Sequence, residues 1–271
     1  MELFRQLEPP YERFEPSMLG PEFPRELEVV SRPWFACGYR QGIAAYLNFF
    51  LLREVIETHD TAFPPRFRTF RSMADSFYQT DLFIRDVTDS GMKPTGGISS
   101  PAVRGMLEGM MKRHRRISIP EWMMTYFGFS LLEMVEKQVG VRDPEEKRLH
   151  LAYMAKAYRI MGMRFSEDRG RMERFSRAIE REQAGATPQL EQHARNILLL
   201  GEMAGVSSRW EEMSAMLPEA TREALRGVYP KVAPGPLARV TARALGRVLM
   251  KKAVGAPRKA VPVTAARDQS P

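Results

Sequence analysis

The sequence contains little of what most metal or disulfide frameworks require. Its 271 residues include one cysteine, Cys37, and four histidines. A single cysteine excludes an internal disulfide framework and any zinc or iron–sulfur site that is built from several cysteines. The chain also has no HExxH pair, no GxSxG nucleophile turn, no phosphate-binding loop and no dinucleotide-binding glycine fingerprint. These absences argue against non-haem metal, nucleophilic hydrolase and nucleotide-dependent chemistry.

A long uninterrupted apolar run is also absent. The most apolar stretch, residues 35–56, is broken by Arg40, Gln41, Asn48 and Arg53. A charge at the bilayer centre costs about 2 to 3 kcal/mol, so this stretch predicts a buried helix and not a membrane span. The first 16 residues carry acidic side chains and prolines where an export signal needs an apolar core. We therefore expect a cytoplasmic protein, either free or peripheral on a membrane.

Strand-like alternation is nearly absent, whereas helix-start signals recur. A capping residue and a proline precede apolar periodic segments at Ser100-Pro101, Ser118-Ile119-Pro120 and Asp143-Pro144. We predict helices over residues 39–57, 66–88, 101–116, 120–138, 144–163, 166–183, 187–204, 207–216 and 219–228. The expected fold is all-α, a single bundle of about nine core helices followed by a C-terminal basic amphipathic helix. The predicted regions are a proline-rich N-terminal arm (1–33), a helical domain (34–230), the basic helix (231–253) and a disordered tail (254–271).

The net charge of +8 is confined to one end of the chain. Nine of the 41 basic residues and one of the 33 acidic residues lie in residues 231–271, so the preceding 230 residues hold 32 of each sign. This distribution argues against a general nucleic-acid binder and for a local electrostatic contact. No aromatic residues interleave with the charges, so we expect no nucleic-acid partner.

The basic helix has two clearly different faces. Leu237, Val240, Ala244, Leu245, Val248 and Leu249 share one side, and four basic residues recur every fourth position on the other: Arg239, Arg243, Arg247 and Lys251. This pattern is typical of a helix at the surface of an anionic membrane. It is equally typical of a helix that packs its apolar face on a core and exposes its basic face to solvent.

One histidine lies on an apolar helical stripe. His114 follows Val103, Leu107 and Met110 at spacings of three and four residues, which directs its imidazole inward. An inward imidazole could be an axial ligand of a buried haem or another metal, or a hydrogen-bonded core residue. His150 and His193 also lie on apolar stripes, and we interpret both as core residues. The 18 methionines, many of them between residues 106 and 163, either line a pocket for a bulky apolar ligand or fill gaps in the core.

Three segments resemble a known oxygenase family, over about residues 35–185. In the segment after Pro101, Arg104, His114, Ile119 and Tyr126 match an arginine, a histidine, an isoleucine and an aromatic-rich helix of that family. The acid-led segment from Asp143 ends in Met161-Gly162-Met163, similar to the family's Met-Gly-Ile. Arg71, Asp75 and Ser76 resemble its Arg-x-x-Asp-Thr element, with one extra residue and serine for threonine. The family includes the mycophenolic-acid-pathway membrane oxygenase and the bacterial latex-clearing rubber oxygenases.

The resemblance implies an all-helical haem b protein that uses dioxygen to cleave carbon–carbon double bonds in apolar isoprenoid chains. It implies that His114 is the proximal iron ligand and that Arg71, Asp75 and Ser76 belong to the distal side. Arg104 would contact either a haem propionate or a structural carboxylate. The alternative is a non-enzymatic helical protein that binds a lipid or hydrophobic metabolite and has no active haem.

Overall fold

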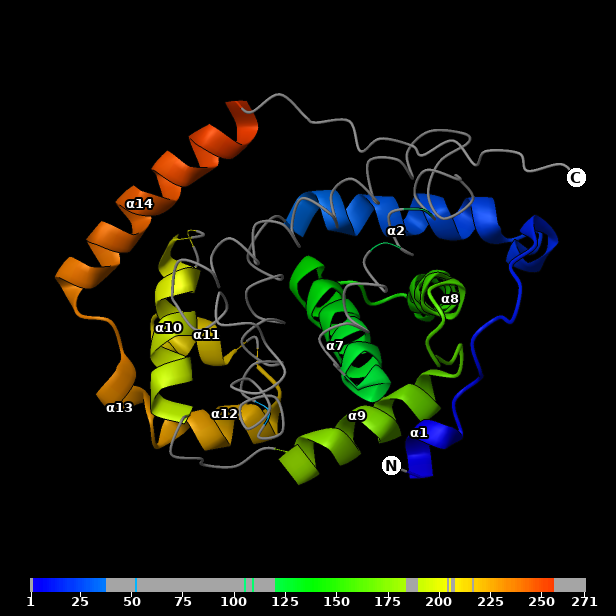
Figure 1. Cartoon of the computed structure of the whole chain (residues 1–271), viewed down its shortest axis with the longest axis horizontal. Helices are drawn as coiled ribbons and strands as arrows, with labels where there is room; N and C mark the ends of the chain where they lie inside the picture. The colour runs from blue at the N-terminus through cyan, green and yellow to red at the C-terminus, as the bar shows by residue number, and fades with distance from the viewer. Residues whose placement is uncertain are drawn as a thin grey trace, which may run out of the picture.

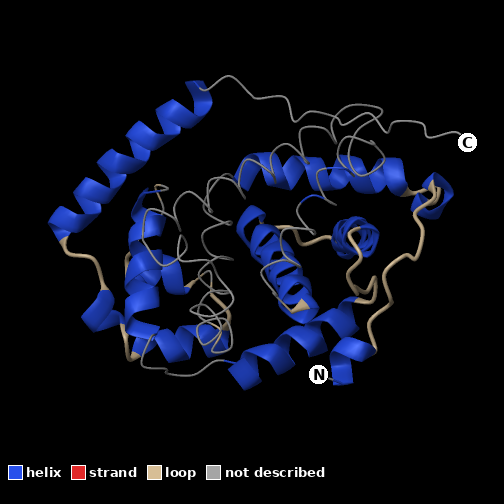
Figure 2. Ribbon diagram, viewed as in Figure 1, coloured by secondary structure: helices blue, strands red, loops and turns tan. Residues whose placement is uncertain are grey.

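Every regular element in the described part of the chain is a helix, as the computed structural model shows (Figures 1 and 2). The structure describes residues 2–37, 52, 105, 109, 120–183, 190–203, 205, 208–215 and 217–255. The elements are α1 (Glu2–Arg5), the 3-10 turn η1 (Pro16–Leu19), α2 (Phe23–Cys37), α7 (Glu121–Val139), α8 (Pro144–Ile160), α9 (Arg169–Gln183), α10 (Leu190–Met203), α11 (Trp210–Ser214), α12 (Glu219–Arg226), α13 (Tyr229–Val232) and α14 (Pro236–Gly255). The prediction of an all-α fold is confirmed.

Local capping chemistry fixes both ends of α8. The Asp143 carboxylate accepts a hydrogen bond from the Glu145 backbone N–H at 3.1 Å, and Pro144 occupies the first turn. At the other end Gly162 has a φ of 83°, a conformation that favours glycine. The Met163 N–H bonds the Tyr158 carbonyl at 3.0 Å and the Gly162 N–H bonds the Arg159 carbonyl at 3.2 Å. This pair of bonds is a Schellman motif, which ends α8 at Ile160, three residues before the predicted end.

The helix α9 begins three residues later than predicted. Ser166, the predicted first residue of this helix, accepts a hydrogen bond from the Asp168 N–H through its hydroxyl oxygen at 3.0 Å. The Asp168 carboxylate in turn accepts from the Arg171 N–H at 3.1 Å, and α9 starts at Arg169. Asp168 is therefore the residue that caps this helix, because its side chain satisfies an N–H of the first turn.

The N-terminal arm predicted for residues 1–33 is shorter than expected. Residues up to about 22 do follow the surface of other elements, since the Tyr11 N–H bonds the Arg159 carbonyl and the Phe165 N–H bonds the Glu8 carbonyl. From Phe23, however, the chain forms α2, a core helix that packs on α8 and α7. Prolines misled the prediction here, because a proline in the first turn of a helix costs no hydrogen bond.

The described helices form two neighbouring groups around one apolar core (Figure 1). In the first group α2, α7 and α8 pack on one another, and α9 packs on α7 and α1. In the second group α10 contacts α14 and α13, and α12 joins the two groups by packing on both α13 and α9. The helix α8 is central, since its residues from Leu149 to Tyr158 are all buried. The large, fully buried side chains include Tyr126, Phe129, Phe165 and Phe175.

Leu52 is the one described residue of the predicted buried helix over residues 39–57. It is buried in the core, with 1% of its surface exposed, but it lies in a bend and not in a helix. The expectation of burial is met at this position and the expectation of helix is not. Among the residues that the structure describes, no helix is both long and apolar enough to cross a membrane.

Candidate functional site

The residues that the resemblance assigns to the haem site lie outside the described part of the chain. These are Arg71, Asp75, Ser76, Arg104 and His114. Within the predicted helix that carries His114, the structure describes Gly105 and Gly109, and both are helical. Their distance of four residues is one helical turn, as the predicted helix requires. His59 also falls outside the described residues, as does the C-terminal tail beyond residue 255.

The next described helix along the sequence is α7, which carries Tyr126 of the resemblance motif. Its first turns bury Trp122, Met123, Met124, Tyr126 and Phe129. Gly128 allows a close approach of α8, because a Cβ at this position would collide with the Tyr158 ring. Burial without a charged partner raises the pKa of Tyr158. The interior around Gly128 and Tyr158 is therefore largely apolar.

Methionines contribute much of this interior. Buried methionines come from α7, α8, the turn after α8 and α9: Met123, Met124, Met134, Met154, Met161, Met163 and Met172. All of them except Met134 belong to the same core as the aromatic side chains, which fits their interpretation as gap-filling residues. The thioether chains can also adapt to a bulky apolar ligand with little strain.

A pair of acidic side chains lies between α7 and α9, next to Tyr126. The Tyr126 hydroxyl donates to Glu180 Oε1 at 3.3 Å, and the Ser176 hydroxyl donates to the same oxygen at 3.3 Å. Burial raises the pKa of Glu180, and these two hydrogen bonds only partly oppose it. Burial also raises the pKa of Glu133 to about 7, and the negative charge of Glu180 adds to the shift. Each carboxyl group makes the other harder to ionise.

Because its pKa is raised, Glu133 is suited to proton transfer. A carboxyl group that titrates near pH 7 is present in both protonation states under ordinary conditions, so it can either donate or accept a proton. Motif inspection overlooked both Glu133 and Glu180. One signal could have found Glu133, because it lies seven residues, or about two helical turns, after Tyr126 on the same face of α7.

His150 is a structural residue and has no free nitrogen for a metal. Its side chain is 1% exposed, Nδ1 lies 3.3 Å from Glu136 Oε1, and Nε2 lies 3.2 Å from the Val29 carbonyl oxygen. The carbonyl can only accept, so Nε2 carries a hydrogen. Pro33 explains why this carbonyl needs an outside donor, since a proline in α2 has no N–H to bond the oxygen four residues earlier.

Arg169 is the second basic side chain that contacts Glu136, and it connects α9 to α7. Arg169 Nη2 donates to Glu136 Oε1 at 2.7 Å and to the Lys147 carbonyl at 3.1 Å. Glu136 thus receives contacts from α8 and from the start of α9 while its own side chain is almost fully buried. The interpretation of His150 as a core residue is confirmed. His193 lies in α10, and its side chain is outside what the structure describes.

A second buried acid joins α10 to α14. Glu202 has no exposed surface, and its Oε1 accepts from the Ser208 N–H at 2.8 Å and from the Ser208 hydroxyl at 2.6 Å. Arg243 Nε donates to Oε2 at 2.6 Å, and Arg239 Nε lies 3.9 Å from Oε1. Burial alone would raise the pKa of Glu202, but the Ser208 and Arg243 hydrogen bonds outweigh it and hold this pKa below its usual value.

The described residues provide no ligand for the predicted haem or for a metal ion. Across the described ranges, no group of three or more histidine, cysteine, aspartate or glutamate side chains is arranged to hold a metal ion. His150 has both ring nitrogens engaged by protein oxygens, so it is not available as an iron ligand. Comparison of the sequence with family models and curated proteins, and of the fold with solved structures, finds no match.

Proposed function

We propose that this chain is a haem b-dependent oxygenase that cleaves carbon–carbon double bonds of an apolar, isoprenoid-like substrate. The proposal rests on the resemblance over about residues 35–185, in which His114 corresponds to the proximal ligand. The observation that carries it is the junction between α8 and α9. There an acid-capped helix ends at Met161-Gly162-Met163, and a new helix follows, which is the local structure that the resemblance predicts.

In this proposal, some residues of the chain would bind the haem and others would position dioxygen. Haem, when bound, would supply the activation of dioxygen that amino-acid side chains cannot provide. His114 would be a ligand of the iron. Arg71 and Asp75 would position dioxygen by charge-assisted hydrogen bonds, and Ser76 belongs to the same sequence element. Arg104 precedes His114 by ten residues, about 15 Å along a helix, and would neutralise a propionate or a structural carboxylate.

The apolar interior supports the choice of substrate. Trp122, Met123, Met154 and Phe165 are buried in the part of the core that α7 and α8 share. Such surroundings exclude water and favour an alkene over a polar substrate. The same surroundings would suit the rival function, the binding of a lipid or hydrophobic metabolite without haem. The two functions differ in one measurable property, which is the bound cofactor.

The visible spectrum of the purified protein tests the proposal. We expect protein expressed with a haem precursor to show a Soret band, and His114→Ala to lose it while retaining the far-UV circular dichroism of the wild type. His193→Ala is the matched control and should keep the band. Haem-free protein that is folded and was well supplied with the precursor would contradict the proposal and favour the rival. A Soret band that persists in His114→Ala would contradict the assignment of the ligand.

A further inference from the structure

The helix α14 turns its apolar side toward solvent. Leu237, Val240, Leu245 and Val248 are 80%, 65%, 45% and 52% exposed. At 100° per residue these positions fall within one side of the helix. Their exposure contradicts the sequence-based alternative in which this apolar face packs on the core.

The opposite side of α14 is the one that packs on α10. Ala242 is buried, and a Cβ on Gly246 would collide with the backbone carbonyl of Met203 at the end of α10. Arg239 and Arg243 share this side and interact with the buried Glu202. A buried carboxylate without a cation is strongly unfavourable, so Glu202 fixes which side of α14 faces inward. Two of the four basic residues predicted to face a membrane are therefore committed to the protein.

The remaining charge of α14 lies beside the exposed apolar residues. Pro236–Gly255 contains five basic residues and no acidic residue. Arg247 is exposed and carries no ion pair among the described residues, and its helical position adjoins that of Val240 and Val248. Lys251 and Lys252 follow within the same helix. The outward side of α14 thus combines an apolar row of about 16 Å, from residue 237 to residue 248, with uncompensated positive charge.

We propose that this outward side of α14 docks on an anionic phospholipid membrane, with the helix axis parallel to the membrane plane. Exposed leucine and valine side chains would insert at the boundary of the acyl chains, and Arg247 would contact lipid phosphates. Charge argues against a second copy of the chain as the occupant, because a symmetric contact would bring together two helices that each contain basic residues and no acidic residue. This inference is independent of the proposed oxygenase function.

Vesicle co-sedimentation of the full chain tests the proposal. The probe is a vesicle of equimolar phosphatidylglycerol and phosphatidylcholine, compared with a vesicle of phosphatidylcholine alone. We expect the double variant Val240→Ser with Val248→Ser to lower the partition coefficient on anionic vesicles by about tenfold or more. Arg247→Glu should lower it by about tenfold, because each basic residue near an anionic surface contributes about 1 kcal/mol.

Two matched controls separate docking from general surface effects. Val139→Ser changes an exposed valine at the end of α7, and Arg226→Glu reverses an exposed arginine at the end of α12, so both should bind vesicles like the wild type. All the variants change exposed side chains and should keep the wild-type circular dichroism. Three results would overturn the proposal: no binding of the wild type to anionic vesicles, equal binding by the α14 variants, or a wild-type dimer that dissociates in the double variant.

Discussion

Two pairs of helices in this protein are each joined by an ion pair to a buried carboxylate, but the large apolar side chains are buried in the first pair and exposed on α14 in the second. In the pair of α2 and α8, Lys156 donates to the buried Glu26 at 2.5 Å. In the pair of α10 and α14, Arg243 donates to the buried Glu202 at 2.6 Å. The first ion pair lies among large apolar side chains, with Phe23 stacked on Tyr153 at 5.9 Å between ring centroids. On the side of α14 that faces the second ion pair the neighbouring residues are Ala242 and Gly246, and the large apolar side chains of α14 are exposed on its other side.

The two carboxylates also titrate in opposite directions. Burial raises the pKa of Glu26, because the hydrogen bond from Lys156 only partly opposes desolvation and the oxygen Oε2 has no partner. The pKa of Glu202 falls, because Ser208 and Arg243 together outweigh its burial. A buried acid with few donors is costly to ionise, and one with several donors is stabilised as an anion. The comparison teaches that an amphipathic pattern alone does not decide which face of a helix is buried.

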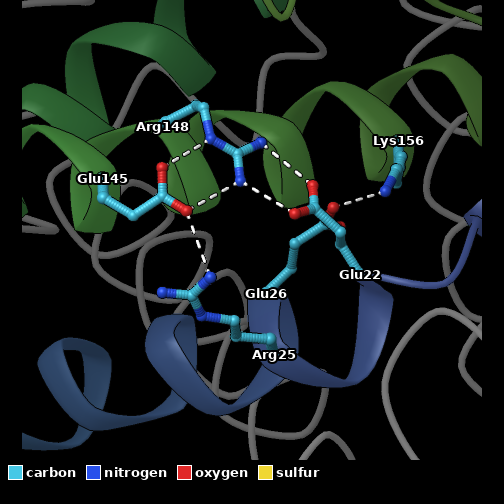
Figure 3. Close-up of polar contacts among 6 residues, drawn as sticks. All are labelled: Glu22, Arg25, Glu26, Glu145, Arg148 and Lys156. Atoms are coloured by element: carbon cyan, nitrogen blue, oxygen red, sulfur yellow. Dashed lines mark hydrogen bonds and ion pairs between the residues drawn. The ribbon is translucent and has the colours of Figure 1, made fainter.

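Exposed charges reinforce the first pair and are visible beside Lys156 in Figure 3. Arg148 bonds Glu145 at 2.8 and 2.9 Å and Glu22 at 3.1 and 3.2 Å, and Arg25 reaches Glu145 at 3.2 Å. The hydrogen bonds from Arg148 lower the pKa of Glu145. These contacts align α2 along α8, but solvent screens them, so the buried pair should dominate the stability.

The largest expected effect comes from breaking that buried pair. Lys156→Met leaves Glu26 buried without a cation, and we expect it to lower the free energy of unfolding by about 3 to 5 kcal/mol in urea denaturation. Adding Glu26→Leu should recover most of this loss, because an apolar pair of similar volume has no desolvation cost. A loss below about 1 kcal/mol in the single variant would show that Glu26 already folds in its neutral form.

A smaller effect is expected where α14 meets α10. Gly246→Ala places a methyl group against the Met203 carbonyl, so the two helices must separate at a cost of about 1 to 3 kcal/mol. Trypsin should then cut α14 at its arginines faster than in the wild type, while the rest of the chain stays protected. The control is Gly227→Ala, since a Cβ there meets open space and φ is −71°. Equal proteolysis of the two variants would contradict the close approach of α14 and α10.

The smallest expected effect is a pH dependence that belongs to Glu133. Its pKa is about 7 in the folded protein and near 4.5 in the unfolded chain, so the unfolded state loses its proton first as pH rises. The contribution of Glu133 to the free energy of unfolding therefore falls as the pH rises from the unfolded pKa to the folded pKa, and it stays low above about pH 7. Glu133→Gln should remove the fall, giving a gain over wild type on the order of 1 kcal/mol at alkaline pH and almost none at acidic pH.

Urea denaturation at several pH values measures this difference. The exposed Glu223 on α12 provides the control, because Glu223→Gln should leave the pH profile of stability unchanged. A gain for Glu133→Gln that is the same at every pH would point to packing as its cause and not to ionisation.

Local signals in the sequence predicted most of the described fold. The Asp143-Pro144 start of α8 depends on residues within one turn, so capping rules found it, whereas the end of α8 was predicted at residue 163, three residues too late. The start of α9 was missed because Ser166 and Asp168 compete for the same role. The helix α2 was missed because Pro33 lies inside it, and the donor that replaces the missing N–H comes from His150 on a distant segment.

Contacts between residues that are far apart in the sequence explain the features that sequence patterns did not predict. Arg239 and Arg243 read as a solvent- or membrane-facing stripe until Glu202, about 40 residues earlier, is placed against them. Likewise, the raised pKa of Glu133 depends first on burial by the surrounding helices and then on the charge of Glu180, which belongs to another helix. Periodicity reports which residues share a side of a helix, but it does not report what that side contacts. The assignment of His114 to haem remains a prediction.

Cysteine labelling most directly tests the claim that α14 packs with the side of Arg239, Ala242 and Arg243 inward and its apolar side outward. In a Cys37→Ser background, single cysteines are placed at Val240, Val248 and Ala242, and their rates of reaction with a maleimide are compared. We predict that the cysteines at 240 and 248 react as fast as one at the exposed Val139, and that the cysteine at 242 reacts at least tenfold more slowly, because only position 242 is buried. Fast labelling at 242 together with protection at 240 and 248 would contradict the account.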